Sequence, residues 1–110
     1  MSGLSTHVLD QTIGRPGAGV RVAVFRDGAP LGVAVTNADG RCTDLQGEGP
    51  LTPGQYRLVF SIGAYFTRSG VVGAPFFEDV VIEFTISAGM ERCHVPLLAS
   101  PFAYSTYRGS

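Results

Sequence analysis

The chain has 110 residues, 45% of them hydrophobic, which is enough for one domain with a buried core. Its formal net charge is −1 with acidic and basic residues interspersed, so the composition offers no basic stripe for nucleic acid or an anionic membrane. Fifteen glycines and seven prolines without a repeating period favour many short strands over long helices. We therefore expect a single all-β domain over residues 1–110.

The first two expected strands cover residues 4–9 and 20–26. Strand side chains alternate, so His7 should lie on the face opposite Val8. The valines of residues 20–26 fall on a single face and predict a core-facing strand. Between the two strands, residues 10–19 are rich in glycine and read as turn.

Asp27-Gly28 is a strong hairpin signal, so residues 31–36 should return beside residues 20–26. We expect the large aliphatic residues of this returning strand to face the core: Leu31, Val33 and Val35.

The second half of the chain predicts three further elements. Residues 44–54 contain few strand formers and indicate a connection, whereas residues 56–62 and 80–86 alternate as strands. Residues 63–70 lie between glycines and are the one plausible helix, about two turns long.

The C-terminal region predicts a closing pair of strands, over residues 93–99 and 102–107. Pro96 cannot donate to a ladder, so we expect a local irregularity at that point. Seven or eight short strands with glycine-rich turns indicate a β-sandwich with one short helix.

His7 and His94 are the two histidines of the chain, and both should lie on outward strand faces together with Tyr107. With Arg41, which follows a turn, they could carry out proton transfer on an anionic or carbonyl-rich ligand. The same residues could also be ordinary surface groups, and their spacing alone does not decide between these interpretations.

Neither the cysteines nor the histidines have metal-ligand spacing, so no metal site is expected. Cys42 and Cys93 are interpreted as free buried thiols. No basic segment followed by an apolar run opens the chain and no stretch could span a bilayer, so we expect a cytoplasmic location and no membrane partner.

Five segments together resemble the 5-hydroxyisourate hydrolases, a transthyretin-like family of purine catabolism, and the resemblance extends from residue 4 to the C-terminus. The closing Tyr-Arg-Gly-Ser is the most specific of them. The segments are Leu4-Ser-Thr-His-Val-Leu-Asp10, Gly14-Arg-Pro16, Thr36-Asn-Ala-Asp-Gly-Arg41, His94-Val-Pro-Leu-Leu98 and Ser105-Thr-Tyr-Arg-Gly-Ser110.

The resemblance implies a transthyretin-like, eight-stranded β-sandwich that forms a homotetramer with active sites in a central channel. It implies hydrolytic ring opening of 5-hydroxyisourate without metal or organic cofactor. By position, His7, Arg41 and His94 match the catalytic residues of the family. The substrate-binding tail matches Tyr107, Arg108, Gly109 and Ser110. Either histidine could be the general base, and we lean toward His7.

One motif departs from the family, which usually has His-Tyr where this chain has Arg92-Cys93. This departure puts in doubt the role of a third imidazole. Two other functions remain open: a carrier of small aromatic ligands in the same channel, and a plain interaction sandwich. The first would have no need of two histidines and an arginine, and the second no need of the closing tetrapeptide.

Overall fold

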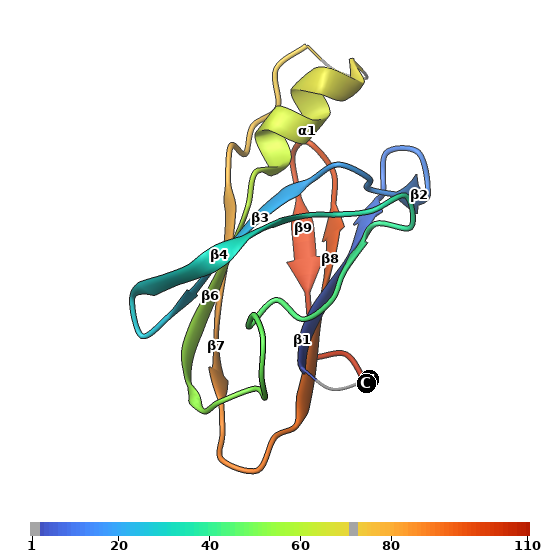
Figure 1. Ribbon diagram of the computed structural model, residues 1–110. Helices are drawn as coiled ribbons and strands as arrows, with labels where there is room; N and C mark the ends of the chain where they lie inside the picture. The colour runs from blue at the N-terminus through green and yellow to red at the C-terminus, as the bar shows by residue number, and fades with distance from the viewer. Residues whose placement is uncertain (1–2, 71–72) are drawn as a thin grey trace.

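The computed structural model describes residues 3–70 and 73–110. Over these residues the chain forms nine strands and one helix (Figure 1). The elements are β1 (Gly3–Asp10), β2 (Arg15–Pro16), β3 (Arg21–Arg26), β4 (Ala29–Val35), β5 (Arg41–Cys42), β6 (Gly54–Phe60), α1 (Ile62–Ser69), β7 (Val80–Ile86), β8 (Arg92–Ala99) and β9 (Tyr104–Thr106).

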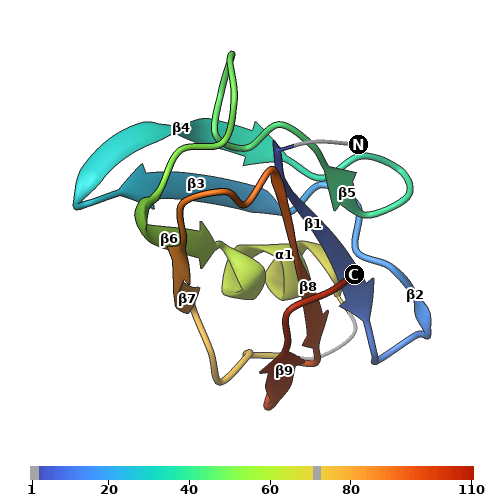
Figure 2. The same cartoon turned by 90° about the horizontal axis from the view of Figure 1, so that it is seen from below.

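The strands form two sheets packed face to face, which Figure 2 shows as separate layers. One sheet has the order β2-β1-β8-β9, with β5 also paired to β1, and the other has the order β4-β3-β6-β7. The predicted sandwich with one short helix is therefore confirmed. The first sheet is built around a parallel pair, β1 and β8, which come from opposite ends of the chain.

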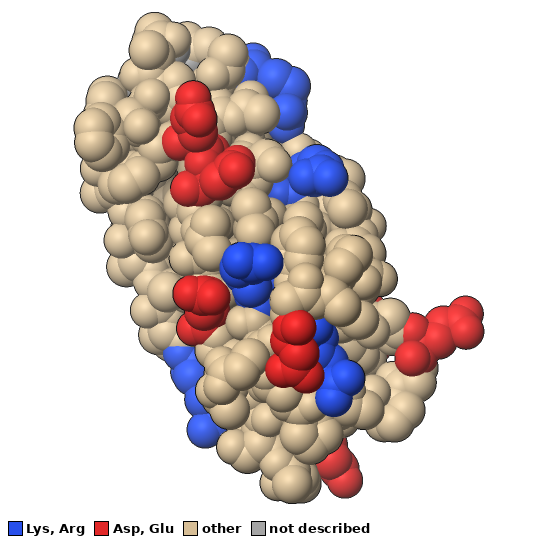
Figure 3. Space-filling view, turned by 90° about the vertical axis from the view of Figure 1, so that its left-hand side faces the viewer, with Lys and Arg blue, Asp and Glu red and all other residues tan. Residues whose placement is uncertain are grey.

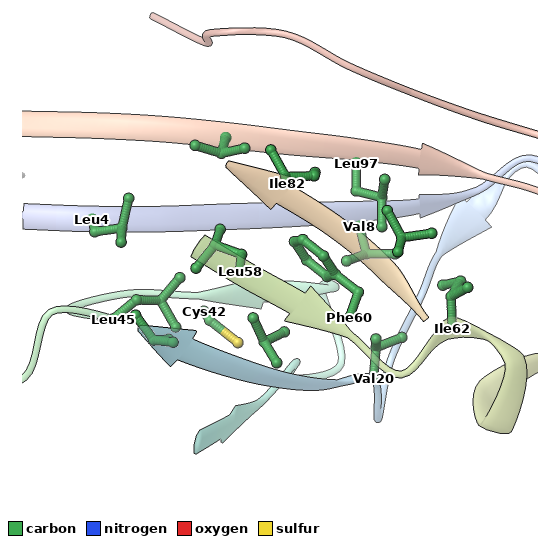
Figure 4. Close-up of a cluster of buried hydrophobic side chains, with 14 of the residues drawn as sticks. Leu4, Val8, Val20, Cys42, Leu45, Leu58, Phe60, Ile62, Ile82 and Leu97 are labelled. Atoms are coloured by element: carbon green, nitrogen blue, oxygen red, sulfur yellow. The ribbon is translucent and has the colours of Figure 1, made fainter. Parts of the chain in front are cut away.

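Alternation along the strands produces the core. In β1, Leu4, Thr6 and Val8 are fully buried, whereas the residues between them are half-buried on the opposite face. Figure 4 shows Leu4, Val8 and Leu97 of this sheet facing Leu58 and Phe60 of the other. Each such side chain stabilises the fold by about 1.5–3 kcal/mol relative to exposure.

The hairpin at Asp27-Gly28 forms as predicted, and both residues adopt positive φ angles of 50° and 83°. The predicted core face of the returning strand is wrong. Leu31, Val33 and Val35 are 41%, 56% and 60% exposed.

An irregularity in the hairpin explains the difference. The register of β3 with β4 shifts between Val24 and Phe25, so that Val24 pairs with Gly32. Residues paired across two strands point to the same face, so Ala34, which pairs with the buried Val22, is half-buried against the core, while Val33 and Val35 point outward. Figure 3 views the molecule from the side on which β4, β6 and β7 lie and shows a mostly uncharged surface with scattered acidic and basic groups.

The helix is α1, one residue earlier than predicted, and it covers one end of the sandwich (Figure 1). Gly70 ends it in the left-handed conformation, with φ 70°. Tyr65 ties it to the first sheet, because its hydroxyl donates to Oδ2 of the buried Asp10 at 2.6 Å. Burial and this carboxylate raise the pKa of Tyr65 to about 12. None of the helices in the described ranges is long and apolar enough to cross a membrane.

Candidate active site

His94 lies on the outward face of the first sheet, as predicted. Its neighbours Cys93 and Val95 are buried in the core, so alternation turns the imidazole away from it. The side chain is half-buried rather than fully solvated.

A hydroxyl from the other end of the chain holds the imidazole in place. The parallel pairing of β1 with β8 sets Ser5 beside His94, and Oγ of Ser5 lies 2.8 Å from Nδ1 of His94. One position further along, the Thr6 hydroxyl donates to the carbonyl of Val95 at 2.6 Å and holds this register. With Nδ1 engaged, Nε2 is the ring nitrogen left to meet a ligand.

The surroundings of His94 favour its neutral form. Burial lowers the pKa of the imidazole below its usual range, and the positive charge of Arg41 and the nearby His7 lower it further. At neutral pH the ring is therefore unprotonated and able to accept a proton.

Arg41 reaches the site through a turn and a two-residue strand. Oδ1 of Asn37 accepts hydrogen bonds from the backbone N–H of Asp39 at 2.9 Å and of Arg41 at 3.0 Å, which fixes the turn. β5 then pairs with β1 so that Arg41 lies opposite His7. The two side chains therefore share the outward face that also carries His94.

The C-terminal residues return to this face through an isolated bridge. The backbone N–H of Gly109 donates to the carbonyl of His94 at 2.7 Å. A Cβ on Gly109 would lie 2.6 Å from Cδ2 of His94, so only glycine permits this approach. In Figures 1 and 2 the C-terminus accordingly lies beside β1.

The irregularity predicted at Pro96 affects one side of β8. Pairing of β8 with β1 continues past Pro96 without a register shift. On the other side, the ladder with β9 ends at the pair Leu97–Thr106 and resumes only at the bridge His94–Gly109. The interruption falls opposite Pro96. The carbonyl of Pro96 accepts a hydrogen bond from the Thr106 hydroxyl at 2.7 Å, so this side of the residue faces β9. The backbone N–H that proline lacks would point to the same side, which explains why the ladder with β9 is interrupted there.

These segments enclose a hollow of about 590 Å³. It contains five of the seven residues expected at the site. Its lining is Gly3, Ser5, Thr6, Arg41, Cys42, Thr43, Arg92, Cys93, His94, Arg108, Gly109 and Ser110.

Two expected site residues lie outside this lining. His7 is half-buried on the same sheet face, close enough to His94 to influence its pKa. Tyr107 lines a second hollow of about 240 Å³, between β7 and β8, together with Phe84 and Met90.

The cysteines are free and buried, as expected. Cys42 and Cys93 pair with β1 from opposite sides, at Thr6 and Leu4, so β1 lies between the two thiols. Burial raises the pKa of both thiols. In the part of the chain that the structure describes, no three His, Cys, Asp or Glu side chains are placed to hold a metal ion.

Comparison with known proteins agrees with this architecture. The family model described as "HIUase/Transthyretin family" matches residues 4–109. The chain belongs to this family. The family assignment and the transthyretin-like fold predicted from the sequence are therefore confirmed.

Relatives of the family are similar over their full length. The 5-hydroxyisourate hydrolase of Caulobacter vibrioides is 52% identical over 116 residues and covers 100% of both chains. The solved structure of the Klebsiella pneumoniae 5-hydroxyisourate hydrolase is 43% identical, covers 100% of both chains and has a TM-score of 0.89. Transthyretin from Sparus aurata is 30% identical, covers 99% of this chain and 97% of its own, and has a TM-score of 0.88.

Among the lining residues to which the sequence analysis gave no role in the site, Ser5 and Arg92 bear most on its chemistry. Ser5 shares a strand face with His7, which is a usable signal. Its contact with His94 depends on a pairing between residues 89 positions apart, which periodicity does not reveal. Arg92 shares a face with His94 at a spacing of two residues and could have been found in that way.

Proposed function

We propose that this chain is a hydrolase that opens the ring of 5-hydroxyisourate to 2-oxo-4-hydroxy-4-carboxy-5-ureidoimidazoline in urate degradation. Full-length relatives carry the name 5-hydroxyisourate hydrolase. The observation that carries the mechanism is the placement of His94, held by Ser5 at 2.8 Å, in one hollow with Arg41 and the C-terminal tail.

We assign the general base to His94 rather than to His7. With Nδ1–H donating to the Ser5 hydroxyl, Nε2 accepts a proton from water as the water oxygen attacks a ring carbonyl carbon. The lowered pKa keeps this ring unprotonated at neutral pH. His7, outside the lining, assists through its effect on His94.

Arg41 and the tail have complementary roles. The attack places negative charge on the carbonyl oxygen, and the guanidinium of Arg41 stabilises this oxyanion. The ring C–N bond then breaks, the leaving nitrogen takes up the proton that His94 had accepted, and the new carboxylic acid ionises to a carboxylate. Arg108 and Ser110 line the hollow and bind the substrate, while Gly109 fixes the tail to His94.

The carrier alternative has weaker support. Its structural basis is the similarity to transthyretin. The hollow, however, presents His94 and several guanidinium groups, which suit a charged and reacting ligand better than a passively held aromatic one.

We further propose a cytoplasmic homotetramer. In the described parts of the chain, β7 pairs only with β6 and β9 only with β8, and such edges are commonly covered by another chain. Two free cysteines suit a reducing compartment. Sedimentation equilibrium should give the mass of a tetramer. A monomer with full activity would contradict the proposed assembly.

The decisive assay follows the ultraviolet absorbance of enzymatically generated 5-hydroxyisourate with and without the protein. Wild type should accelerate its decay. His94→Asn and Arg41→Gln should each lower the rate by about a hundredfold or more. No acceleration by the wild type would overturn the function, and a larger loss in His7→Asn than in His94→Asn would overturn the assignment of the base.

A further inference from the structure

Arg92 has no role in the mechanism above, yet it lies in the same hollow. It begins β8 two residues before His94, so both side chains project from the same strand face. Parallel pairing places it beside Gly3 of β1. The side chain is exposed, so the guanidinium can meet a ligand at the solvent side of the hollow.

Arg92 completes a set of three unpaired cations. Arg41, Arg92 and Arg108 come from β5, β8 and the C-terminal segment, and all three line the hollow. Across residues 3–70 and 73–110 the one ion pair joins Arg26 to Asp27, so none of the three has a carboxylate partner there.

Acidic groups do not offset this charge. Among the described residues, the lining contains no Asp or Glu side chain. Asp44 approaches Gly3 but is not a lining residue. The lining thus carries three arginine side chains and no acidic side chain, an excess of positive charge that favours an anionic ligand.

Arg92 differs from Arg41 in what it can influence. The groups that lower the pKa of His94, besides burial, are Arg41 and His7, and Arg92 is not among them. Its charge is therefore better placed to act on a ligand than on the titration of the base.

We propose that Arg92 is a specificity-determining residue that binds negative charge on the ligand, both on the ring before it opens and on the carboxylate created by ring opening. The proposal rests on the proposed function. In hydrolysis of a cyclic amide, the hydroxyl of water adds to the carbonyl carbon, a proton goes to the nitrogen as the C–N bond breaks, and the new acid ionises to a carboxylate. Arginine suits this role because its planar fork matches a carboxylate in a bidentate manner.

The test compares Arg92→Gln with Arg92→Lys and with Arg21→Gln, a matched loss of an exposed charge on the other sheet. With 5-hydroxyisourate, Arg92→Gln should raise KM by about threefold to tenfold and leave kcat and the pH midpoint unchanged. Its kcat/KM should also depend less on salt. Arg92→Lys should recover part of the loss, and Arg21→Gln should behave as wild type.

A binding arm makes the test independent of turnover. Orotate and uracil share a six-membered ring and differ by a carboxylate. The difference between their affinities, measured by isothermal titration calorimetry, therefore reports how the protein recognises the negative charge. Arg92→Gln should weaken orotate binding by about threefold to tenfold and leave uracil binding unchanged. If wild type does not hydrolyse 5-hydroxyisourate, the proposed function fails while this arm still tests Arg92. Unchanged orotate binding in Arg92→Gln, or an equal loss in Arg21→Gln, would overturn the proposal.

Discussion

Replacement of Gly109 by alanine should disable His94 without unfolding the protein. The new Cβ would lie 2.6 Å from Cδ2 of His94 and 3.3 Å from its Cβ. Ordinary contact begins at 3.4 Å, so the ring and the tail must separate by about 0.8 Å. Movement of the imidazole by that amount is enough to break its 2.8 Å hydrogen bond with Ser5.

The expected magnitude follows from this displacement. Misplacement of a catalytic group by about 1 Å costs up to about a hundredfold in rate, so kcat/KM should fall by about ten- to a hundredfold. The residues around Gly109 are exposed and bury little apolar area, so the free energy of unfolding should change by less than about 1 kcal/mol.

Gly73→Ala is the matched control. An added Cβ there meets no atom within 4 Å, and its φ lies outside the left-handed region. The assay combines the decay of 5-hydroxyisourate with the two-dimensional NMR resonance of the His94 ring Cδ2–Hδ2. Wild-type kinetics and an unmoved resonance in Gly109→Ala would refute the reasoning, because the contact would then have been relieved without disturbing the imidazole.

Three further outcomes are expected. Catalysis requires neutral His94, so kcat/KM should fall as the pH decreases through the pKa of His94, which lies below the usual range. Arg41→Gln removes a positive charge near His94 and should therefore raise this pKa. A pH–rate profile of the variant should show the acid limb of kcat/KM at higher pH than in wild type. Deletion of Arg108–Ser110 should abolish most activity with the elution volume and Tm nearly unchanged, whereas near-normal turnover would show an inert tail. Tyr65→Phe should lower the free energy of unfolding by about 1–3 kcal/mol in urea titrations, because buried Asp10 then loses the hydroxyl that donates to its Oδ2 at 2.6 Å. An unchanged free energy of unfolding would show that this hydrogen bond does not stabilise the fold.

Patterns that depend on neighbours along one strand could be predicted well. Alternation correctly separated the buried and outward faces of β1 and β8, and therefore placed both histidines outward. The Asp27-Gly28 turn was predictable because few residue pairs adopt two successive positive φ angles.

Features that depend on register could not be predicted in the same way. Val33 is exposed because the register of β3 with β4 shifts within the hairpin, and the alternation of residue types along β4 does not reveal this shift. The Ser5–His94 contact requires that β1 pair with β8, and in parallel. Pro96 was informative, but which side of the strand it would interrupt depended on the position of β9.

The location of the site within the fold explains why so many long-range contacts converge on it. Ser5, Arg41, His94 and Gly109 belong to four segments that meet only when β1 is paired on both sides and the tail has returned to β8. No single segment holds both the base and the cation that tunes it. Changes within this sheet should therefore affect kcat directly, whereas changes on the exposed face of β4 should affect activity only through the folded fraction.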